Sequence, residues 1–124
     1  MNTPYRHKVD PSTLEGWTPF DLRLKKLIDT PLYVPIKLKG IDIRGTTILA
    51  EFRMQNNSKD ALCSLSSQYN EIEFTDDRHG EFLIKIPQTL NTSCVYDVVV
   101  RWSDGSVMKL IYGRLEARNP VTGY

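Results

Sequence analysis

Hydrophobic and polar side chains alternate with a period of two along several stretches of this chain, which is the pattern of half-buried β-strands. Residues 31–40 place an aliphatic side chain at every second position from Leu32 to Leu38, with tyrosine, proline and lysine between them. Pro35 lies within this run. Because proline has no N–H to donate to a β-ladder, we expect this strand at the edge of a sheet.

The same alternation continues in residues 46–54. The side chains that it directs toward a core are Ile48, Ala50, Phe52 and Met54. Residues 55–68 are rich in asparagine, serine and aspartate, which favour turns. We therefore expect a loop there, within which residues 61–65 can add a short strand.

Two further strands are predicted at residues 69–74 and 80–87, on either side of a polar turn. In the second strand the side chains that share one face are Phe82, Ile84 and Ile86. Pro87 then ends the strand, because proline cannot continue the hydrogen-bond ladder.

The strongest local signal is a hairpin in residues 94–117, whose sequence is CVYDVVVRWSDGSVMKLIYGRLEA. Asp104-Gly105 between two alternating apolar runs favours a tight turn, since glycine accepts the positive φ angle that the turn demands. The side chains expected inside are Tyr96, Val98, Val100 and Trp102 in the first run and Met108, Leu110 and Tyr112 in the second. Apolar residues occupy both faces, so we expect the hairpin in the centre of a sheet.

About seven short strands, with turn signals about every 8 to 12 residues, predict an all-β fold, an immunoglobulin-like antiparallel β-sandwich. We place this domain at residues 21–118, after an extended N-terminal arm at residues 1–20 and before a short tail at 119–124. The only apolar spacing of helical kind is a weak pattern in residues 20–28.

The N-terminal arm combines prolines and glycine with polar residues and lacks strand periodicity. Tyr5, Trp17 and Phe20 are unusual there, because disordered segments are normally poor in aromatic residues. These side chains either fold back on their own domain or dock on a neighbouring subunit. In the second case they are interface anchors, and Arg6 and Lys8 supply polar contacts.

Charge and composition exclude several classes of function. The 16 basic and 15 acidic side chains give a formal charge of +1, which offers no long-range field to attract a nucleic-acid backbone. The basic residues Arg23, Lys25 and Lys26 are expected to cover the solvent-exposed side of their segment. No run approaches the roughly 18 apolar residues of a membrane span. The N-terminus lacks the apolar core of a secretory signal, so we expect synthesis in a cytosol.

Candidate chemistry is sparse. Cys63 and Cys94 are too few for a disulfide framework and form no zinc-binding motif, although a bridge between the two is left open. The two histidines, His7 and His79, have no partner at a catalytic or metal-binding spacing. We therefore expect a protein that is not an enzyme and that binds no cofactor.

The densest acidic cluster is formed by Glu71, Glu73, Asp76 and Asp77. Oxygen ligands in that number can bind calcium, but the spacing is not that of an EF-hand loop. A solvated strand face followed by a polar turn explains the same residues. Metal binding, and with it a metal-assisted hydrolase, is therefore the weaker hypothesis for this cluster.

Three stretches in order, residues 40–54, 80–87 and 96–117, resemble a domain that is widespread in tailed-phage virion proteins. The similarity is to the immunoglobulin-like N-terminal domain of the phage baseplate upper protein family and to small phage proteins built of that domain alone. The matching residues are Ile41 to Gly45, Arg53, Gly80, Phe82, Ile84, Ile86, Tyr96, Asp97, Asp104, Gly105 and Gly113. The resemblance covers about residues 30–118; the N-terminal arm is longer than the family pattern, and no receptor-reaching extension precedes Tyr124.

This resemblance implies a structural component of the virion, an adaptor or connector of the tail, neck or baseplate that acts through protein–protein contacts in a symmetric oligomer. Its partners would be other virion proteins and copies of itself, without nucleic acid or membrane. It would be located in the virion after synthesis in the host cytoplasm. The alternative is a β-sandwich that binds carbohydrate or a cell surface through Tyr33, Tyr69 or Tyr112, although alternation places Tyr112 on the same face as Leu110.

Overall fold

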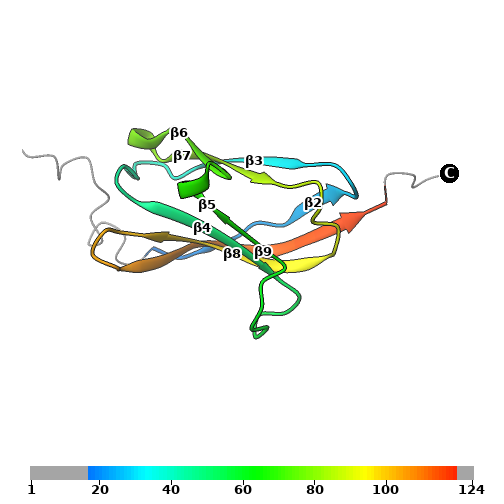
Figure 1. Ribbon diagram of the computed structural model, residues 1–124. Coiled ribbons are helices and arrows are strands. Elements are labelled where there is room, and N and C mark those ends of the chain that lie inside the picture. Colours follow the sequence, from blue (N-terminus) through cyan, green and yellow to red (C-terminus); the bar gives the residue numbers. More distant parts are fainter. Residues whose placement is uncertain (1–16, 120–124) are drawn as a thin grey trace, which may run out of the picture.

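The structure, a computed structural model, describes residues 17–119 and folds them into two β-sheets that face each other (Figure 1). It confirms the all-β sandwich expected from the alternating pattern. Among the residues expected at a partner interface, Tyr5, Arg6 and Lys8 lie outside the described part of the chain.

The larger sheet has six strands in the order β1-β9-β8-β4-β5, and β2 also pairs with β9. Its strands are β1 Phe20–Asp21, β2 Leu24–Leu27, β4 Thr47–Arg53, β5 Cys63–Ser66, β8 Cys94–Arg101 and β9 Val107–Arg118. The β8–β9 hairpin lies in the interior of this sheet, as its two apolar faces predict. The first two strands run parallel to β9, whereas the other pairs are antiparallel.

The smaller sheet has three strands in the order β3-β7-β6, so Pro35 of β3 lies at a sheet edge, as predicted. Its strands are β3 Leu32–Lys37, β6 Ile72–Asp76 and β7 Glu81–Ile86. Two 3-10 turns flank β6, and they are η3 Ser67–Tyr69 and η4 Asp77–His79. The order β3-β7-β6 corresponds to strands B, E and D of an immunoglobulin-like sandwich. The order β9-β8-β4-β5 corresponds to strands G, F, C and C′.

The core between the sheets is built from the inward positions that the alternation predicts in β3, β4, β7 and β8. The confirmed positions are Val34, Ile36, Leu38, Ile48, Ala50, Phe52, Phe82, Ile84, Ile86, Tyr96, Val98, Val100 and Trp102. The rings of Phe52 and Tyr96 stack with their centroids 5.4 Å apart. The prediction for Met54 is wrong: it is 51% exposed because β4 ends one residue earlier, at Arg53.

The predicted inward orientation of Tyr112 is also wrong, because β9 contains a β-bulge. Val98 is paired with Ile111, but the next residue of β8 is paired with Lys109, which leaves Leu110 as an extra residue. An extra residue reverses the alternation beyond it. Leu110 and Ile111 are therefore both buried, and Tyr112 points outward with 44% of its surface exposed.

Residues 20–28 form two short strands instead of the weak helical pattern, and one basic residue is not on the solvent side. Alternate residues of β2 share a face, so Lys26 lies with Leu24 inside the sandwich and is 1% exposed. Arg23 and Lys25 are exposed, as expected. The sequence pattern hides this burial because lysine is normally a surface residue.

The break between β1 and β2 lies where the chain crosses Gly113 of β9. The Leu22 N–H donates to the Tyr112 carbonyl at 2.9 Å, and the Tyr96 hydroxyl donates to the Leu22 carbonyl. A Cβ on Gly113 would lie 2.2 Å from that carbonyl oxygen. Glycine is needed here because only a residue without a side chain permits the two backbones to approach so closely.

Candidate functional site

The outer face of the larger sheet carries rows of side chains, because the strand registers place outward residues next to one another. Glu51 of β4 is the partner of Asp97 of β8. Asp97 is in turn the partner of Tyr112 of β9, which is the partner of Asp21 of β1. The bulge in β9 is what brings Tyr112 into this largely acidic row.

A second row, two residues further along the strands, is basic. Arg53 of β4 is the partner of Val95 of β8, and Val95 is the partner of Arg114 of β9. Arg23, from the break between β1 and β2, lines the same hollow as Arg114. An acidic row and a basic row thus cross the larger sheet side by side, and we call the depression that they line the cross-sheet groove.

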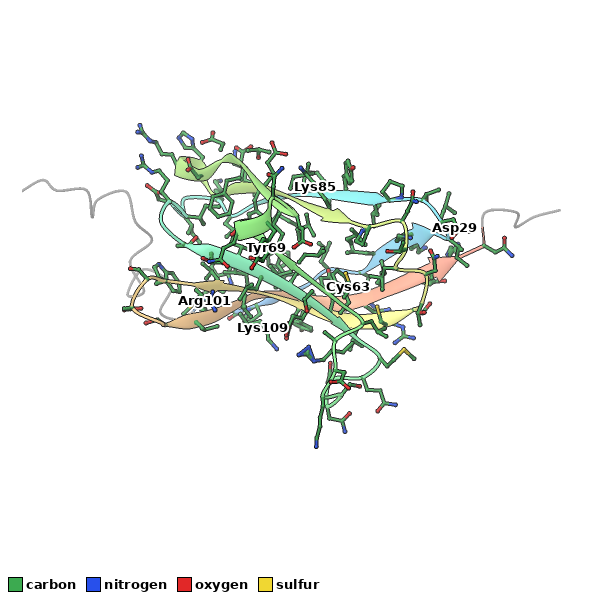
Figure 2. All side chains as sticks on the ribbon, in the orientation of Figure 1. Asp29, Cys63, Tyr69, Lys85, Arg101 and Lys109 are labelled. Carbon is green, nitrogen blue, oxygen red and sulfur yellow. The ribbon has the colours of Figure 1, made fainter. Side chains whose placement is uncertain are left out.

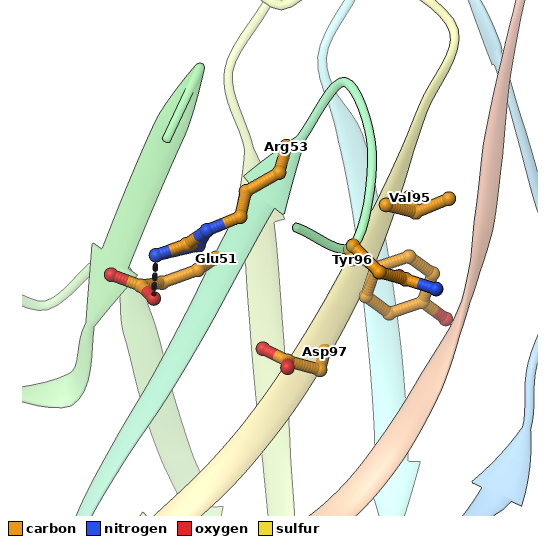
Figure 3. A pocket seen from close by; sticks show the side chains of 6 residues that line it. Glu51, Arg53, Val95, Tyr96 and Asp97 are labelled. Atoms are coloured by element: carbon orange, nitrogen blue, oxygen red, sulfur yellow. Dashed lines mark hydrogen bonds and ion pairs between the residues drawn. The ribbon is translucent and has the colours of Figure 1, made fainter. Parts of the chain in front are cut away.

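Three adjoining hollows, of about 220, 240 and 330 Å³, make up the cross-sheet groove. The first is shown in Figure 3, and its lining residues are Glu51, Arg53, Asn56, Val95, Tyr96 and Asp97. The second shares Asn56, Val95 and Tyr96 with the first, and the third shares Arg23 and Arg114 with the second. Sites for drug-sized ligands typically have volumes of about 300–1,000 Å³. Two of the three hollows are smaller than this range and the third lies at its lower end. Side chains of another macromolecule therefore suit them better than an enclosed small ligand.

Ion pairs occupy the β4 end of the groove. The Arg53 guanidinium lies 2.8 Å from the Glu51 carboxylate and also donates to the Ser58 carbonyl at 3.1 Å, which ties the β4–β5 loop to the sheet (Figure 3). Asp97 pairs with Lys109 at 3.4 Å. Exposed pairs of this kind contribute only about 0–1 kcal/mol each. Their main effect is to orient the side chains and the loop.

At the opposite end of the groove, Arg23 and Arg114 line the hollows together with the acidic residues Asp21 and Glu116. Within residues 17–119, Arg23 and Arg114 have no ion-pair partner. A guanidinium group recognises a carboxylate through two parallel hydrogen bonds. The exposed ring of Tyr112 lies in the same hollow. Arginine and tyrosine are both enriched at the centres of protein interfaces.

Two of the predicted interface residues are described, and they differ in their contacts. Trp17 is half-buried and packs against the core of its own chain. Of the two alternatives for the aromatic residues of the arm, Trp17 therefore folds back on its own domain instead of docking on a neighbouring subunit. Phe20 lies on β1 at the edge of the larger sheet and is 40% exposed. Phe20 is therefore accessible, whereas much of the Trp17 surface is already used within the domain.

The acidic side chains for which metal binding is the weaker hypothesis have separate partners. The Glu71 carboxylate accepts a backbone hydrogen bond at 3.0 Å. Glu73 pairs with Lys85 at 2.9 Å, on the smaller sheet. Asp76 pairs with His79 at 2.9 Å. In the part of the chain that the structure covers, no three acidic, histidine or cysteine side chains are placed to hold a metal ion.

Cys63 and Cys94 are both free thiols, so the disulfide that the sequence left open is not formed. Burial raises the pKa of both thiols, to about 11 for Cys94. Because the thiolate is the reactive form, both cysteines are poor nucleophiles at neutral pH.

The sequence alone does not identify the groove residues Arg23, Asn56 and Arg114 as functional. Each is an ordinary polar residue in its own segment, and only the register of β4, β8 and β9 brings them together. The alternation in each strand indicates which side chains point away from the core. In β9 the bulge at Leu110 reverses this alternation before Arg114, so the pattern alone assigns Arg114 to the wrong face.

No protein family model and no curated protein matches this sequence. Among the residues that the structure describes, no helix is long and apolar enough to cross a membrane. The resemblance to phage virion domains therefore remains a hypothesis that depends on the order of the sequence motifs.

Proposed function

We propose that this chain is a structural component of a tailed-phage virion, an adaptor or connector of the tail, neck or baseplate. It acts through protein–protein contacts in a symmetric assembly, with other virion proteins and copies of itself as partners. The observation that carries the contact role is the cross-sheet groove, where Arg23 and Arg114 form no ion pair with any described residue and lie beside the exposed Tyr112. The virion location depends on the sequence resemblance.

Residues that carry the resemblance fall at positions on which the sandwich depends. Gly80 has a φ angle of +73°, and a Cβ there would lie 2.4 Å from the Leu38 carbonyl oxygen. Gly113 admits the connection between β1 and β2, and Tyr96 donates a hydrogen bond to that connection. These requirements support an immunoglobulin-like domain of the kind that the motifs indicate.

The chemistry of the groove defines its partner. Arg23 and Arg114 can bind carboxylates of a partner, and Tyr112 and the edge residue Phe20 can pack against its apolar side chains. A partner segment with acidic and aliphatic residues, lying across β9 and β1, satisfies both. Since a standard protein interface buries about 800 Å² on each partner, the contact extends beyond the groove to the exposed sheet edge.

Mass spectrometry of purified phage particles tests the virion assignment, since the chain must be present in a fixed ratio to other structural proteins. Its absence from particles contradicts the proposal. The contact role is tested with the double variant Tyr112→Ala and Arg114→Glu, for which we expect reduced incorporation of a folded chain. The control is Arg78→Glu, which changes the charge of an exposed turn residue without touching the groove.

The second candidate function is binding of carbohydrate or a cell surface. Tyr33, Tyr69 and Tyr112 are all exposed, but they lie on β3, in η3 and on β9, and of the three Tyr112 is the one that lines the groove. There it lies beside Asp21 and Asn56, whose side chains can hydrogen-bond sugar hydroxyls. Binding on a glycan array that is lost in Tyr112→Ala and kept in Tyr69→Ala supports this function.

A further inference from the structure

A separate cluster of polar groups encloses the amine of Lys26 at the end of the sandwich marked by Asp29 in Figure 2. Lys26 is 1% exposed, although lysine is almost never fully buried without a partner. Its Nζ donates to three oxygens. They are the carbonyl oxygens of Leu27 and Gln88, at 3.2 and 3.4 Å, and Asn91 Oδ1, at 3.2 Å.

Asp29 holds the Asn91 amide from the other side. The Asp29 N–H donates to Asn91 Oδ1 at 2.8 Å, and Asn91 Nδ2 donates to Asp29 Oδ1 at 2.8 Å. Asp29 is itself fixed in a turn with a φ angle of +66°, closed by a hydrogen bond from the Thr30 hydroxyl to the Leu27 carbonyl at 2.8 Å. The amide is thus oriented with its oxygen toward a backbone donor and the amine, and with its nitrogen toward a carboxylate.

We propose that this cluster is an autocatalytic cross-linking site, at which Lys26 and Asn91 form an intramolecular amide bond. Lys26 Nζ is the nucleophile, and Asn91 Cγ is the acyl carbon that it attacks. The Asp29 N–H is placed to stabilise negative charge on Asn91 Oδ1, as an oxyanion donor does. The Asp29 carboxylate lies beside the nitrogen that must leave, where a general acid is required.

The reaction balances without an added reagent. The lone pair of the neutral Lys26 amine forms a bond to Asn91 Cγ, and the carbonyl electrons move to Oδ1. Nζ and Nδ2 are then bonded to the same carbon, and the Asp29 carboxylate, 2.8 Å from Nδ2 before the reaction, accepts a proton from Nζ and passes it to Nδ2. When the carbonyl re-forms, the bond from Cγ to Nδ2 breaks and ammonia leaves. One amide replaces another, and nothing is oxidised or reduced.

Burial and hydrogen bonding act on the charge of Lys26 in opposite directions: the three oxygen acceptors stabilise the ammonium, whereas desolvation favours the neutral amine that the reaction needs, which becomes more populated as the pH rises. Burial lowers the pKa of Lys26 from its usual 10.5, and the nearby Asp29 carboxylate opposes this only in part. Desolvation is the usual way in which proteins make lysine a nucleophile. A buried lysine that is merely held by hydrogen bonds needs three acceptors. The Asn91 oxygen is one of these acceptors, but hydrogen bonding to the amine does not account for the Asp29 carboxylate beside the Asn91 nitrogen.

The bond would join the end of β2 to the connection between β7 and β8, two segments 65 residues apart in the sequence. This inference does not depend on the proposed function, since the cross-link can form in any folded copy of the chain.

Intact-mass spectrometry of the purified full-length protein, after incubation at mildly alkaline pH, tests the inference. Loss of one ammonia lowers the mass by about 17 Da, and a protease digest must then contain a branched peptide joining Lys26 to Asn91. The deficit is expected to disappear in Lys26→Arg, whose guanidinium is a poor nucleophile. It is expected to persist in the control Lys25→Arg, which changes the exposed neighbour.

Asp29→Asn keeps a residue that tolerates a positive φ angle but removes the proton carrier, so the cross-linked fraction should form much more slowly. This variant leaves both reacting side chains in place and therefore separates catalysis from folding. A wild-type protein that keeps its full mass throughout the incubation overturns the proposal. A deficit that maps to any other pair of residues overturns it as well.

Discussion

Replacing Gly113 with alanine tests how the first two strands are attached to the sandwich. The added Cβ would lie 2.2 Å from the carbonyl oxygen of Leu22 and 2.9 Å from its carbonyl carbon. Both are backbone atoms, so the connection between β1 and β2 has to move away from β9. Leu22 is held there by its N–H bond to Tyr112 and by the hydroxyl of Tyr96, and the movement strains both hydrogen bonds.

The magnitude follows from these two contributions. Overpacking in a well-packed region costs about 1–3 kcal/mol, and each hydrogen bond lost costs about 0.5–1.5 kcal/mol. One displacement relieves the clash and weakens the bonds together, so the contributions do not add in full. We expect the free energy of unfolding to fall by about 2–4 kcal/mol, a large part of the 5–15 kcal/mol that is typical of a domain.

Urea unfolding followed by tryptophan fluorescence measures this change, because Trp17 is half-buried and Trp102 is buried. The matched control is Gly40→Ala, where φ is +77° and no atom lies within 4 Å of the added Cβ. Backbone strain alone should cost about 1–2 kcal/mol there. If Gly113→Ala unfolds within about 0.5 kcal/mol of the wild type, the close approach of the two backbones is refuted.

Three other predictions use the same unfolding assay. Phe52→Ala should destabilise the fold by about 3–5 kcal/mol, whereas Met54→Ala should change it by less than about 0.5 kcal/mol; equal effects would contradict the end of β4 at residue 53. Tyr96→Phe keeps the ring but leaves a carbonyl without its donor, at a cost of about 1–3 kcal/mol, while Tyr33→Phe on the exposed face of β3 should be neutral. The folded-state pKa of Cys94 is raised from 9.0 to about 11, so its contribution to stability is present below pH 9 and is lost as the pH rises toward 11. Cys94→Ala should therefore lose less stability than the wild type over that interval, and an identical pH profile would contradict burial of the thiol.

Much of the sandwich could be predicted because several strands alternate strictly and end at turn residues. β3, β4, β7 and β8 satisfy both conditions, and their inward residues lie where the period of two places them. Trp102 could be assigned to the core for the same reason. In these strands the local pattern and the tertiary environment agree, so the pattern is sufficient.

The bulge in β9 could not be predicted, because the residues around it are compatible with both phases. Leu110 and Ile111 are both apolar, so either can face the core without a visible error in the pattern. The choice is made by pairing with β8, where one residue of β9 is left over. The outward position of Tyr112, and with it the candidate site, follows from this non-local choice.

Strands β1 and β2 escaped prediction for a different reason. They have two and four residues, too few for a period to be recognised, and they are held by parallel pairing with a distant strand. Lys26 adds to the difficulty, since its burial depends on acceptors supplied by Gln88 and Asn91. No feature of residues 20–28 alone indicates that those acceptors are present.

The two proposals meet at this edge of the larger sheet. A subunit that grips the chain at or before Phe20 pulls first on the two residue pairs of β1 and then on the four pairs of β2. Ladders so short resist little force by themselves, because each residue pair contributes only a small part of the stability. A covalent bond between Lys26 and Asn91 would stop this peeling at the end of β2 and pass the force to the connection between β7 and β8. A cross-link in a chain that is absent from virions would leave a stabilised module with another role. If virions instead contain the chain without the cross-link, the contacts of the groove, which are spread over β4, β8 and β9, carry the force, and β1 and β2 do not need a covalent bond.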